Sequence, residues 1–218
     1  MSKILSLYNS LYEMYGPQGW WPLLELHGKK GCNPTKSGSI KGYHPDDYSY
    51  PKNKRQQFEI CIGAILAQNT SWPNVEKALI NLKDKRLLDA EKIISASDKM
   101  LSDAIRPAGY FNQKTKKLKI FSKFYKSLKG KTPSRGDLLN CWGVGPETAD
   151  SILLYVYKQP EFVVDTYTKR ILREMKIITS RHSYDDIKSL FEDDLSKDYK
   201  LFQEFHALIV EHAKRLKR

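Results

Sequence analysis

The sequence predicts an all-α protein, and two observations carry that prediction. Apolar residues recur mostly at the 3.6-residue period of an amphipathic helix, whereas sustained alternation, the mark of a half-buried strand, is hard to find. Gly and Pro residues punctuate the chain at short intervals, as expected of short connections between helices. The only strand-like run in the sequence is Phe162–Val164.

The apolar periodicity and its interruptions place the helices in order. They are expected at about residues 2–15, 58–67, 73–82, 112–129, 135–141, 146–157, 166–176, 184–194 and 197–216, with two or three short helices between 87 and 105. The helix at 58–67 is almost wholly apolar and should be buried on all sides. Ser183 and Asp186 have the spacing of a capping box. Residues 27–55 are rich in Gly, Pro and basic residues, and we expect a basic loop there.

The charge balance indicates a polyanionic partner. The 218 residues include 37 Lys and Arg against 25 Asp and Glu, a formal net charge of +12, which favours nucleic acid or an anionic surface. A hydrophobic content of 40% suffices for a packed core and excludes a wholly disordered basic protein. Apolar runs are far too short to span a bilayer and the N-terminus lacks a signal-peptide pattern. We therefore expect an intracellular protein, cytoplasmic or nucleoid-associated, that does not bind membranes.

One stretch, Leu138–Asp150, carries the most informative motif. Two predicted helices flank a hairpin, Gly143-Val144-Gly145. Glycines let the backbone approach a phosphate without a side-chain clash, and the free N–H groups and dipole of the following helix favour the anion. Val144 is expected to hold the hairpin between the helices. Taken alone, the motif also fits an ordinary turn between two packed helices.

Four blocks in a fixed order are more specific than the hairpin alone. In chain order they are Ile65–Thr70, Ile105–Lys114, Cys141–Ala149 and Val163–Thr166. With these blocks the chain resembles the helix-hairpin-helix DNA glycosylases of the endonuclease III superfamily. The resemblance covers residues 58–176, more than half of the chain.

This resemblance implies a two-lobed, all-α helix-hairpin-helix glycosylase fold with a cleft between the lobes. The central lobe would comprise residues 57–160 and contain the helix-hairpin-helix at about 135–157. The second lobe would be formed by residues 1–56 and 161–218, including the basic loop 27–55. Asp165 would lie where the chain crosses between the lobes and would face the cleft.

The implied chemistry depends on Asp165. Breaking the bond between a base and deoxyribose develops oxocarbenium charge on the sugar, and a fixed carboxylate shielded from water stabilises that charge and orients the attacking water. Asp165 also suits a simpler role as the N-cap of the helix that begins near Thr166. Glu147 stands where bifunctional members of the family have a Schiff-base lysine, and a carboxylate cannot form that imine. The resemblance therefore implies a hydrolytic enzyme without lyase activity, in which Asp165 and Glu147 are the candidate catalytic residues.

Cysteines and tryptophans indicate one branch of the family. Cys32, Cys61 and Cys141 are too few and too scattered for a disulfide framework, and no cysteine follows Cys141. The family's usual C-terminal [4Fe–4S] cluster therefore cannot bind, and we expect no cofactor. In this respect the chain is similar to the cluster-lacking 3-methyladenine glycosylases, in which aromatic residues line the base pocket. The candidate pocket residues are Trp20, Trp21, Pro22 and Trp72, although each tryptophan also suits a place in the core.

Further residues are candidates for contact with DNA. They are Gln68, Asn69, Gly143, Val144, Gly145, Thr148, Lys114 and Lys116. Gln68 is expected to fill the gap that a flipped nucleotide leaves in the duplex, and Asn69 is either a second such residue or a helix cap. The helix at 112–129 should have a basic outer face, which would contact phosphates or simply be solvated. The resemblance also allows a monovalent cation at the hairpin.

The expected function is the hydrolytic removal of a damaged base from double-stranded DNA by a monomeric enzyme. An alkylated purine such as 3-methyladenine is the expected substrate, because a cationic base is already a good leaving group and an aromatic pocket selects it by stacking and cation–π attraction. Within the same chemistry, 8-oxoguanine or a mismatched base is the alternative. From another class, the alternative is a non-catalytic helix-hairpin-helix DNA-binding module.

Overall fold

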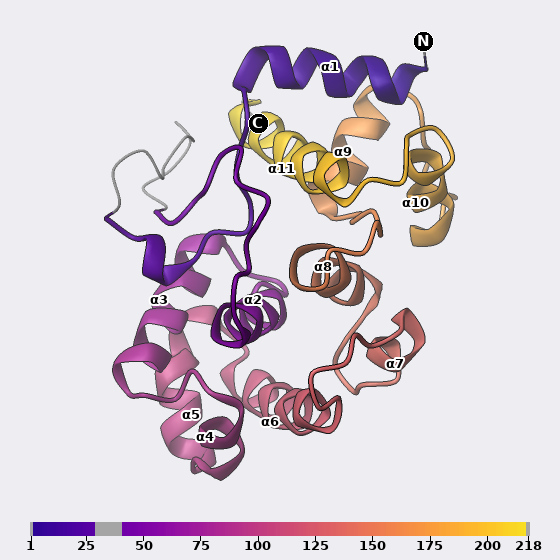
Figure 1. Ribbon diagram of the computed structural model, residues 1–218. Coiled ribbons are helices and arrows are strands. Elements are labelled where there is room, and N and C mark those ends of the chain that lie inside the picture. The colour runs from indigo at the N-terminus through magenta and orange to yellow at the C-terminus, as the bar shows by residue number, and fades with distance from the viewer. Residues whose placement is uncertain (1, 29–40, 217–218) are drawn as a thin grey trace. The chain divides into compact units, whose positions relative to one another are not determined.

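The computed structural model describes residues 2–28 and 41–216 (Figure 1). Within these ranges all regular secondary structure is helical, which confirms the all-α prediction. The α-helices are α1 (Lys3–Tyr15), α2 (Lys54–Leu66), α3 (Trp72–Asp84), α4 (Ala90–Ser95), α5 (Asp98–Ile105), α6 (Phe111–Ser127), α7 (Arg135–Leu139), α8 (Pro146–Val156), α9 (Thr166–Glu174), α10 (Tyr184–Glu192) and α11 (Tyr199–Arg215). Short 3₁₀ helices occupy Leu24–Leu26 and Arg106–Ala108. Cys32 and part of the predicted loop 27–55 lie outside the described residues, and no helix in the described ranges is long and apolar enough to cross a bilayer.

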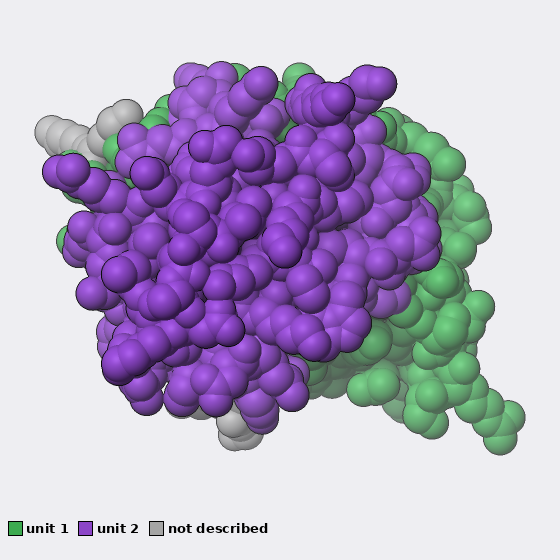
Figure 2. Space-filling view, turned by 90° about the horizontal axis from the view of Figure 1, so that it is seen from below, with its two compact units in different colours: residues 1–50, 153–218 green, residues 51–152 purple. Residues whose placement is uncertain are grey.

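The chain divides into two compact units (Figure 2). Unit 1 comprises Met1–Tyr50 and Leu153–Arg218, and unit 2 is the continuous segment Pro51–Ile152. The sequence-based lobe boundaries near residues 57 and 160 stay a prediction.

α2 is the centre of unit 2. Its residues from Phe58 to Leu66 are all buried, as predicted, and the helix packs against α3 and α6. It begins four residues earlier than expected, at Lys54, because the Asn53 side chain accepts the N–H of Gln56 and caps the first turn. The apolar helix is therefore the core around which the more polar helices of this unit are arranged.

The terminal helices and an aromatic cluster form the core of unit 1. α11 packs against α1 and α9, and Phe162 stacks on Phe191 with ring centres 3.7 Å apart. Phe162–Val164, the strand-like run, is buried but forms no strand, which agrees with the all-α prediction. The backbone N–H groups of this run donate to side chains instead, to Glu192 at 2.8 Å and to Tyr184 at 3.3 Å. Its apolar character serves the aromatic core rather than a sheet.

The surface of α6 is less basic than its own sequence predicts. Lys119 pairs with Asp98 of α5, and Lys126 pairs with Glu91 of α4 at 2.6 Å. Acidic residues from neighbouring helices thus neutralise two of its lysines. Exposed ion pairs of this kind contribute little to stability, but they reduce the charge that α6 offers to a polyanion.

Candidate active site and nucleic-acid interface

The predicted hairpin lies between α7 and α8 in unit 2. Val144 is buried and its N–H donates to the carbonyl of Cys141 at 3.0 Å, which fixes the turn. Arg135 of α7 donates two hydrogen bonds to Asp150 of α8, at 2.8 and 3.3 Å. Because Asp150 is fully buried, this bidentate pair controls how the two helices meet. The sequence reasoning missed the pair, whose members belong to different helices.

The two glycines of the hairpin are not equivalent. Gly143 has φ +89°, and a Cβ added there would lie 2.6 Å from Cγ of Lys117, so the fold itself requires glycine. Gly145 lies outside the left-handed region, and an added Cβ would meet no atom within 4 Å. No atom of the described structure therefore requires glycine at position 145, and a phosphate contact there stays a prediction. The first turn of α8 follows directly, with Glu147 exposed on it.

Gln68 is bound to the hairpin. Its Nε2 donates to the carbonyl of Gly143 and to Oγ1 of Thr148, each at 3.0 Å, and Lys117 donates to its Oε1. In this structure Gln68 and the buried Thr148 therefore join the hairpin to the end of α2. Asn69 is exposed and has φ +54°, so it is the side chain of this turn that reaches solvent. Insertion of either residue into DNA stays a prediction.

Lys114 is not placed to contact a phosphate, and that expectation was wrong. It is 2% exposed, and its ammonium donates to the carbonyls of Leu66 at 2.9 Å and of Ala108 at 2.7 Å. Burial lowers its pKa to about 8. The side chain thus closes the C-terminal end of α2 from inside the unit, where the last carbonyls of a helix need donors.

Unit 2 exposes two aromatic side chains that the sequence reasoning missed. Trp142, directly before Gly143, is 49% exposed, and Nζ of Lys116 lies 4.6 Å from its ring centre. Tyr110, before the first turn of α6, is 66% exposed. Exposed aromatic rings beside cations are typical of surfaces that bind nucleic acid. Both residues lie inside the four sequence blocks that carry the resemblance, and that position was the sequence signal that could have identified them. Trp72, a predicted pocket residue, is half-buried at the start of α3 in this unit.

In unit 1, Asp165 caps α9 with only one of its two oxygens. Oδ1 accepts the N–H of Thr168 at 2.7 Å and its hydroxyl at 2.8 Å. Oδ2 lies 3.7 Å from Nε2 of His206 on α11. Burial by itself raises the pKa of Asp165, but His206 and the bonds from Thr168 outweigh it and hold the pKa below its ordinary value. The side chain is 14% exposed, so an ionised carboxylate occupies a largely water-free place.

Aromatic rings surround Trp20 in the same unit. Trp20 is partly exposed, whereas Trp21 and Pro22 are buried. Trp21 therefore occupies a place in the core, which was the alternative to a place in the base pocket. The rings around Trp20, with their centre-to-centre distances, are His206 (5.5 Å), Trp21 (6.0 Å), Tyr43 (6.3 Å) and Tyr155 (6.4 Å). Through His206, the open ring of Trp20 belongs to the same cluster as Asp165.

A second buried carboxylate joins the Trp20 segment to α11. Glu204 is 2% exposed; its Oε1 accepts the backbone N–H of Gln18 at 2.6 Å, and its Oε2 accepts the hydroxyl of Tyr48 at 2.8 Å. Burial raises the pKa of Glu204 to about 7. Sequence patterns gave no sign of this contact, because both partners are more than 150 residues away along the chain.

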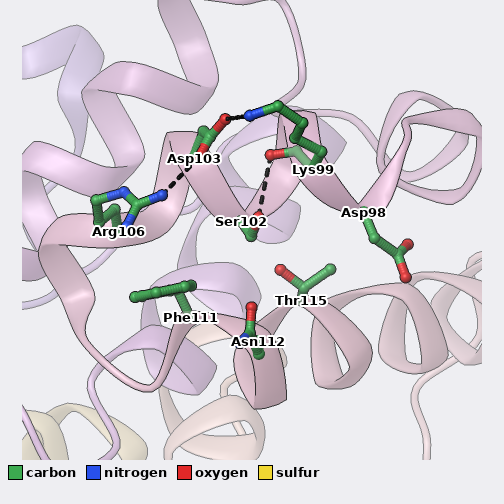
Figure 3. Close-up of a pocket in the computed structure, with 8 residues that line it drawn as sticks. All are labelled: Asp98, Lys99, Ser102, Asp103, Arg106, Phe111, Asn112 and Thr115. Carbon is green, nitrogen blue, oxygen red and sulfur yellow. Dashed lines mark hydrogen bonds and ion pairs between the residues drawn. The ribbon is translucent and has the colours of Figure 1, made fainter.

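A surface groove on unit 2 is lined by charges that already pair with one another (Figure 3). Lys99 and Arg106 both contact Asp103, at 3.1 and 2.7 Å. The guanidinium of Arg106 also lies 4.6 Å from the ring centre of Phe111. None of the predicted site residues lines this groove, so it is separate from the candidate chemistry.

The donor set does not fit an iron–sulfur cluster. In the part of the chain that the structure describes, no group of three His, Cys, Asp or Glu side chains could hold a metal ion. Cys61 and Cys141 are buried free thiols, and no cysteine follows them in the sequence. The absence of a cofactor from the working protein stays a prediction.

Comparison with known proteins identifies the family. Residues 62–197 match the HhH-GPD superfamily of base excision DNA repair proteins. The chain is 39% identical to a putative DNA repair glycosylase of Methanocaldococcus jannaschii, over 99% of this chain and 89% of that protein. The chain therefore belongs to the HhH-GPD superfamily of base excision DNA repair glycosylases, which confirms the resemblance seen in its four sequence blocks.

Two solved structures are also similar. The 3-methyladenine DNA glycosylase MagIII of H. pylori, bound to 1,N6-ethenoadenine, matches with a TM-score of 0.64 and 30% identity, over 74% of this chain and 86% of that one. An endonuclease III trapped in a covalent intermediate with DNA matches with a TM-score of 0.69 and 17% identity, over 96% and 85%. The second likeness shows the fold alone. Both confirm the fold class.

Proposed function

We propose that this DNA glycosylase hydrolyses the N-glycosidic bond of a damaged base flipped out of duplex DNA, without lyase activity, and that its substrate is an alkylated purine such as 3-methyladenine. The observation that carries the proposal is Asp165. One oxygen of this carboxylate is fixed by Thr168, the other faces His206, and little water reaches either. A carboxylate placed in this way suits a developing positive charge.

Asp165 suits charge stabilisation better than strong base catalysis. A pKa below the ordinary value makes it ionised at neutral pH and a weak proton acceptor. When the bond to the base breaks, its electron pair leaves with the base and oxocarbenium charge develops on the deoxyribose, which Asp165 stabilises. Water then adds to the sugar carbon and releases a proton, which Asp165 or bulk water accepts.

Hydrolysis rather than lyase chemistry is supported by Glu147. A lyase forms an imine between an uncharged amine and the sugar, and the residue in the corresponding turn here is a carboxylate. Lys114 has the lowered pKa that such an amine needs, but its Nζ is committed to two carbonyls inside unit 2.

An alkylated purine is supported by the aromatic surroundings of Trp20, because stacking and cation–π attraction favour a cationic base by about 2 kcal/mol in a desolvated site. The H. pylori relative, whose structure holds 1,N6-ethenoadenine, supports the same class. One contact favours an alternative. Nζ of Lys214 lies 5.8 Å from the Trp20 ring centre and would compete with a cationic base. 8-Oxoguanine or a mismatched base therefore remains the second candidate.

Double-stranded DNA is the proposed partner, bound by a monomer through unit 2. Gly145 leaves backbone open before the first turn of α8, and three residues earlier the exposed ring of Trp142 lies against Lys116. Helix N-termini and bare glycine backbone bind phosphate oxygens without reading the sequence of bases.

Base release from defined duplexes tests the proposal. Duplexes carrying one 3-methyladenine, one 8-oxoguanine or one mismatched pair would be incubated with the protein beside an undamaged duplex, and free base quantified. We expect release of the alkylated purine, strand breaks only after alkali, and no adduct after borohydride. Release of 8-oxoguanine alone contradicts the substrate, a borohydride adduct contradicts simple hydrolysis, and binding without release from any duplex indicates a non-catalytic module.

A further inference from the structure

We propose that His206 is a positioning residue that orients the carboxylate of Asp165 for base release, as the middle member of a chain from Tyr155 through His206 to Asp165. The inference rests on the proposed function, because it takes Asp165 as the reacting carboxylate. His206 acts through Asp165 and needs no contact with the substrate.

The position of His206 is unusual for a buried polar side chain. The residue is 4% exposed on α11, and its Nδ1 lies 2.7 Å from the hydroxyl of Tyr155 on α8. Its Nε2 lies 3.7 Å from Oδ2 of Asp165 and has no hydrogen-bond partner among the residues described. Buried nitrogens are normally bonded. A long contact between two groups of one site is expected before the substrate binds, and it tightens when the site is occupied.

The hydroxyl of Tyr155 decides which nitrogen of His206 carries hydrogen. Burial raises the pKa of Tyr155 well above its ordinary value, so the hydroxyl keeps its proton. Two acceptors are within reach, Nδ1 of His206 at 2.7 Å and the carbonyl of Gln203 at 3.3 Å. The shorter contact assigns the hydroxyl hydrogen to Nδ1, so the imidazole carries its own hydrogen on Nε2, facing Asp165. The reverse tautomer would turn a bare lone pair toward the carboxylate.

With this tautomer, Oδ1 of Asp165 accepts from Thr168, and Oδ2 faces the N–H of His206 at 3.7 Å, a contact that would become a hydrogen bond when it tightens. Thr168, one turn into α9, fixes Oδ1, and His206, on α11, faces Oδ2. A carboxylate fixed at one oxygen alone still rotates about that bond, whereas a second bond from His206, once the contact tightens, would hold its plane. The ring of His206 also meets Trp20 edge-on, with centres 5.5 Å apart and planes at 86°. The same imidazole therefore links the carboxylate to the candidate pocket wall.

Two substitutions at His206 in the full chain separate positioning from packing. His206→Gln keeps an N–H donor close to the place of Nε2, and His206→Phe fills the space without a donor. We expect His206→Phe to lower the single-turnover rate of base release by about 10- to 100-fold, with an unchanged Kd for the damaged duplex. His206→Gln should keep at least about a third of the wild-type rate. A purely structural role predicts that both variants lose rate together with thermal stability.

His212→Phe is the matched control. His212 lies further along α11, and its Nδ1 makes a comparable bond of 2.8 Å to the hydroxyl of Tyr15. Removing this bond should lower the melting temperature as His206→Phe does, but leave the rate of base release at the wild-type value.

Three results decide the matter. If His206→Phe keeps the wild-type rate while Asp165→Asn loses it, the positioning role is overturned and the proposed function stands. If Asp165→Asn keeps the wild-type rate, the proposed function fails at its central residue whatever His206 does. If circular dichroism shows that His206→Phe does not fold, Tyr155→Phe replaces it. That variant removes the hydroxyl that orients the imidazole, and we expect a rate about three- to tenfold lower; an unchanged rate overturns the proposal.

Discussion

The hairpin of unit 2 and the Asp165 cluster of unit 1 are built in opposite ways. The hairpin draws its turn, its glycines and its Arg135–Asp150 ion pair from one stretch of about twenty residues, helped by Gln68 from the turn after α2 and by Lys117 from α6. The cluster gathers α8, α9, α11 and the segment around Trp20, and Glu204 reaches a partner 186 residues away. If the hairpin only binds DNA, as we propose, it needs no more than open backbone, which a local motif provides. A carboxylate that must be shielded from water needs walls from several elements.

Asp165→Asn gives the largest expected effect and tests this division of roles. We expect the single-turnover rate of base release to fall by about 10³-fold, because the charge that stabilises the sugar cation is lost. Asn is as good an N-cap as Asp, so α9 should remain intact and the affinity for duplex DNA should stay within about twofold. Rates are measured by base release and affinity by fluorescence anisotropy. Wild-type turnover would show that Asp165 is only a cap.

Glu204→Gln tests whether the buried contacts of Glu204 in unit 1 make the free energy of unfolding depend on pH. A folded pKa near 7 lies above the unfolded value of about 4.5, so the folded chain holds this proton more tightly. The resulting stability is complete below pH 4.5 and is lost as the pH rises through 7. We expect the free energy of unfolding of the wild type to fall by about 3 kcal/mol over this window relative to Glu204→Gln.

Urea unfolding at pH 5, 6, 7 and 8, followed by tryptophan fluorescence, measures that difference. Parallel stability curves for the wild type and Glu204→Gln would mean that Glu204 is already ionised in the folded chain at pH 5. In that case the carboxylate holds Gln18 and Tyr48 as a charged acceptor throughout the physiological range.

Substitution of the two hairpin glycines in unit 2 should give smaller effects, on DNA binding for Gly145 and on stability for Gly143. Gly145→Ala should leave the free energy of unfolding unchanged or raise it by about 0.5 kcal/mol, yet weaken binding to undamaged duplex by about tenfold, since the new methyl group occupies the phosphate's approach. Gly143→Ala is the matched control and should cost about 1 to 2 kcal/mol of stability through its positive φ and Lys117. Unchanged binding by Gly145→Ala would place the phosphate elsewhere.

The helices and the hairpin could be predicted from the sequence because their determinants are local. Periodicity located the all-apolar α2, and Ser183 and Asp186 form the capping box that their spacing indicates. Asp165 could be singled out as a candidate catalytic residue for the same reason, since it lies in a short sequence block before a helix. Its surroundings could not, because His206 and Tyr155 carry no mark that relates them to it before the chain is folded.

Lys114 shows how a local reading fails when residue type outweighs position. Its place among other lysines predicts a charge on the surface. The residue lies four positions before Leu118 and seven before Phe121, on the apolar stripe of α6, and all three are buried. The periodicity contained the correct answer, and the residue type obscured it. Lys119 and Lys126 differ, because their acidic partners come from other helices and no pattern within α6 indicates them.

The discontinuity of unit 1 has a consequence for how the protein is made. Unit 2 is one uninterrupted segment, so all its residues have been synthesised before α9, α10 and α11 are made. Unit 1 must wait, because α1 packs on α11, and Glu204 and His206 both belong to that last helix. We expect a nascent chain to form the hairpin between α7 and α8 first and the buried Asp165 cluster last. A chain broken off before α11 would then hold on to DNA without being able to excise anything from it.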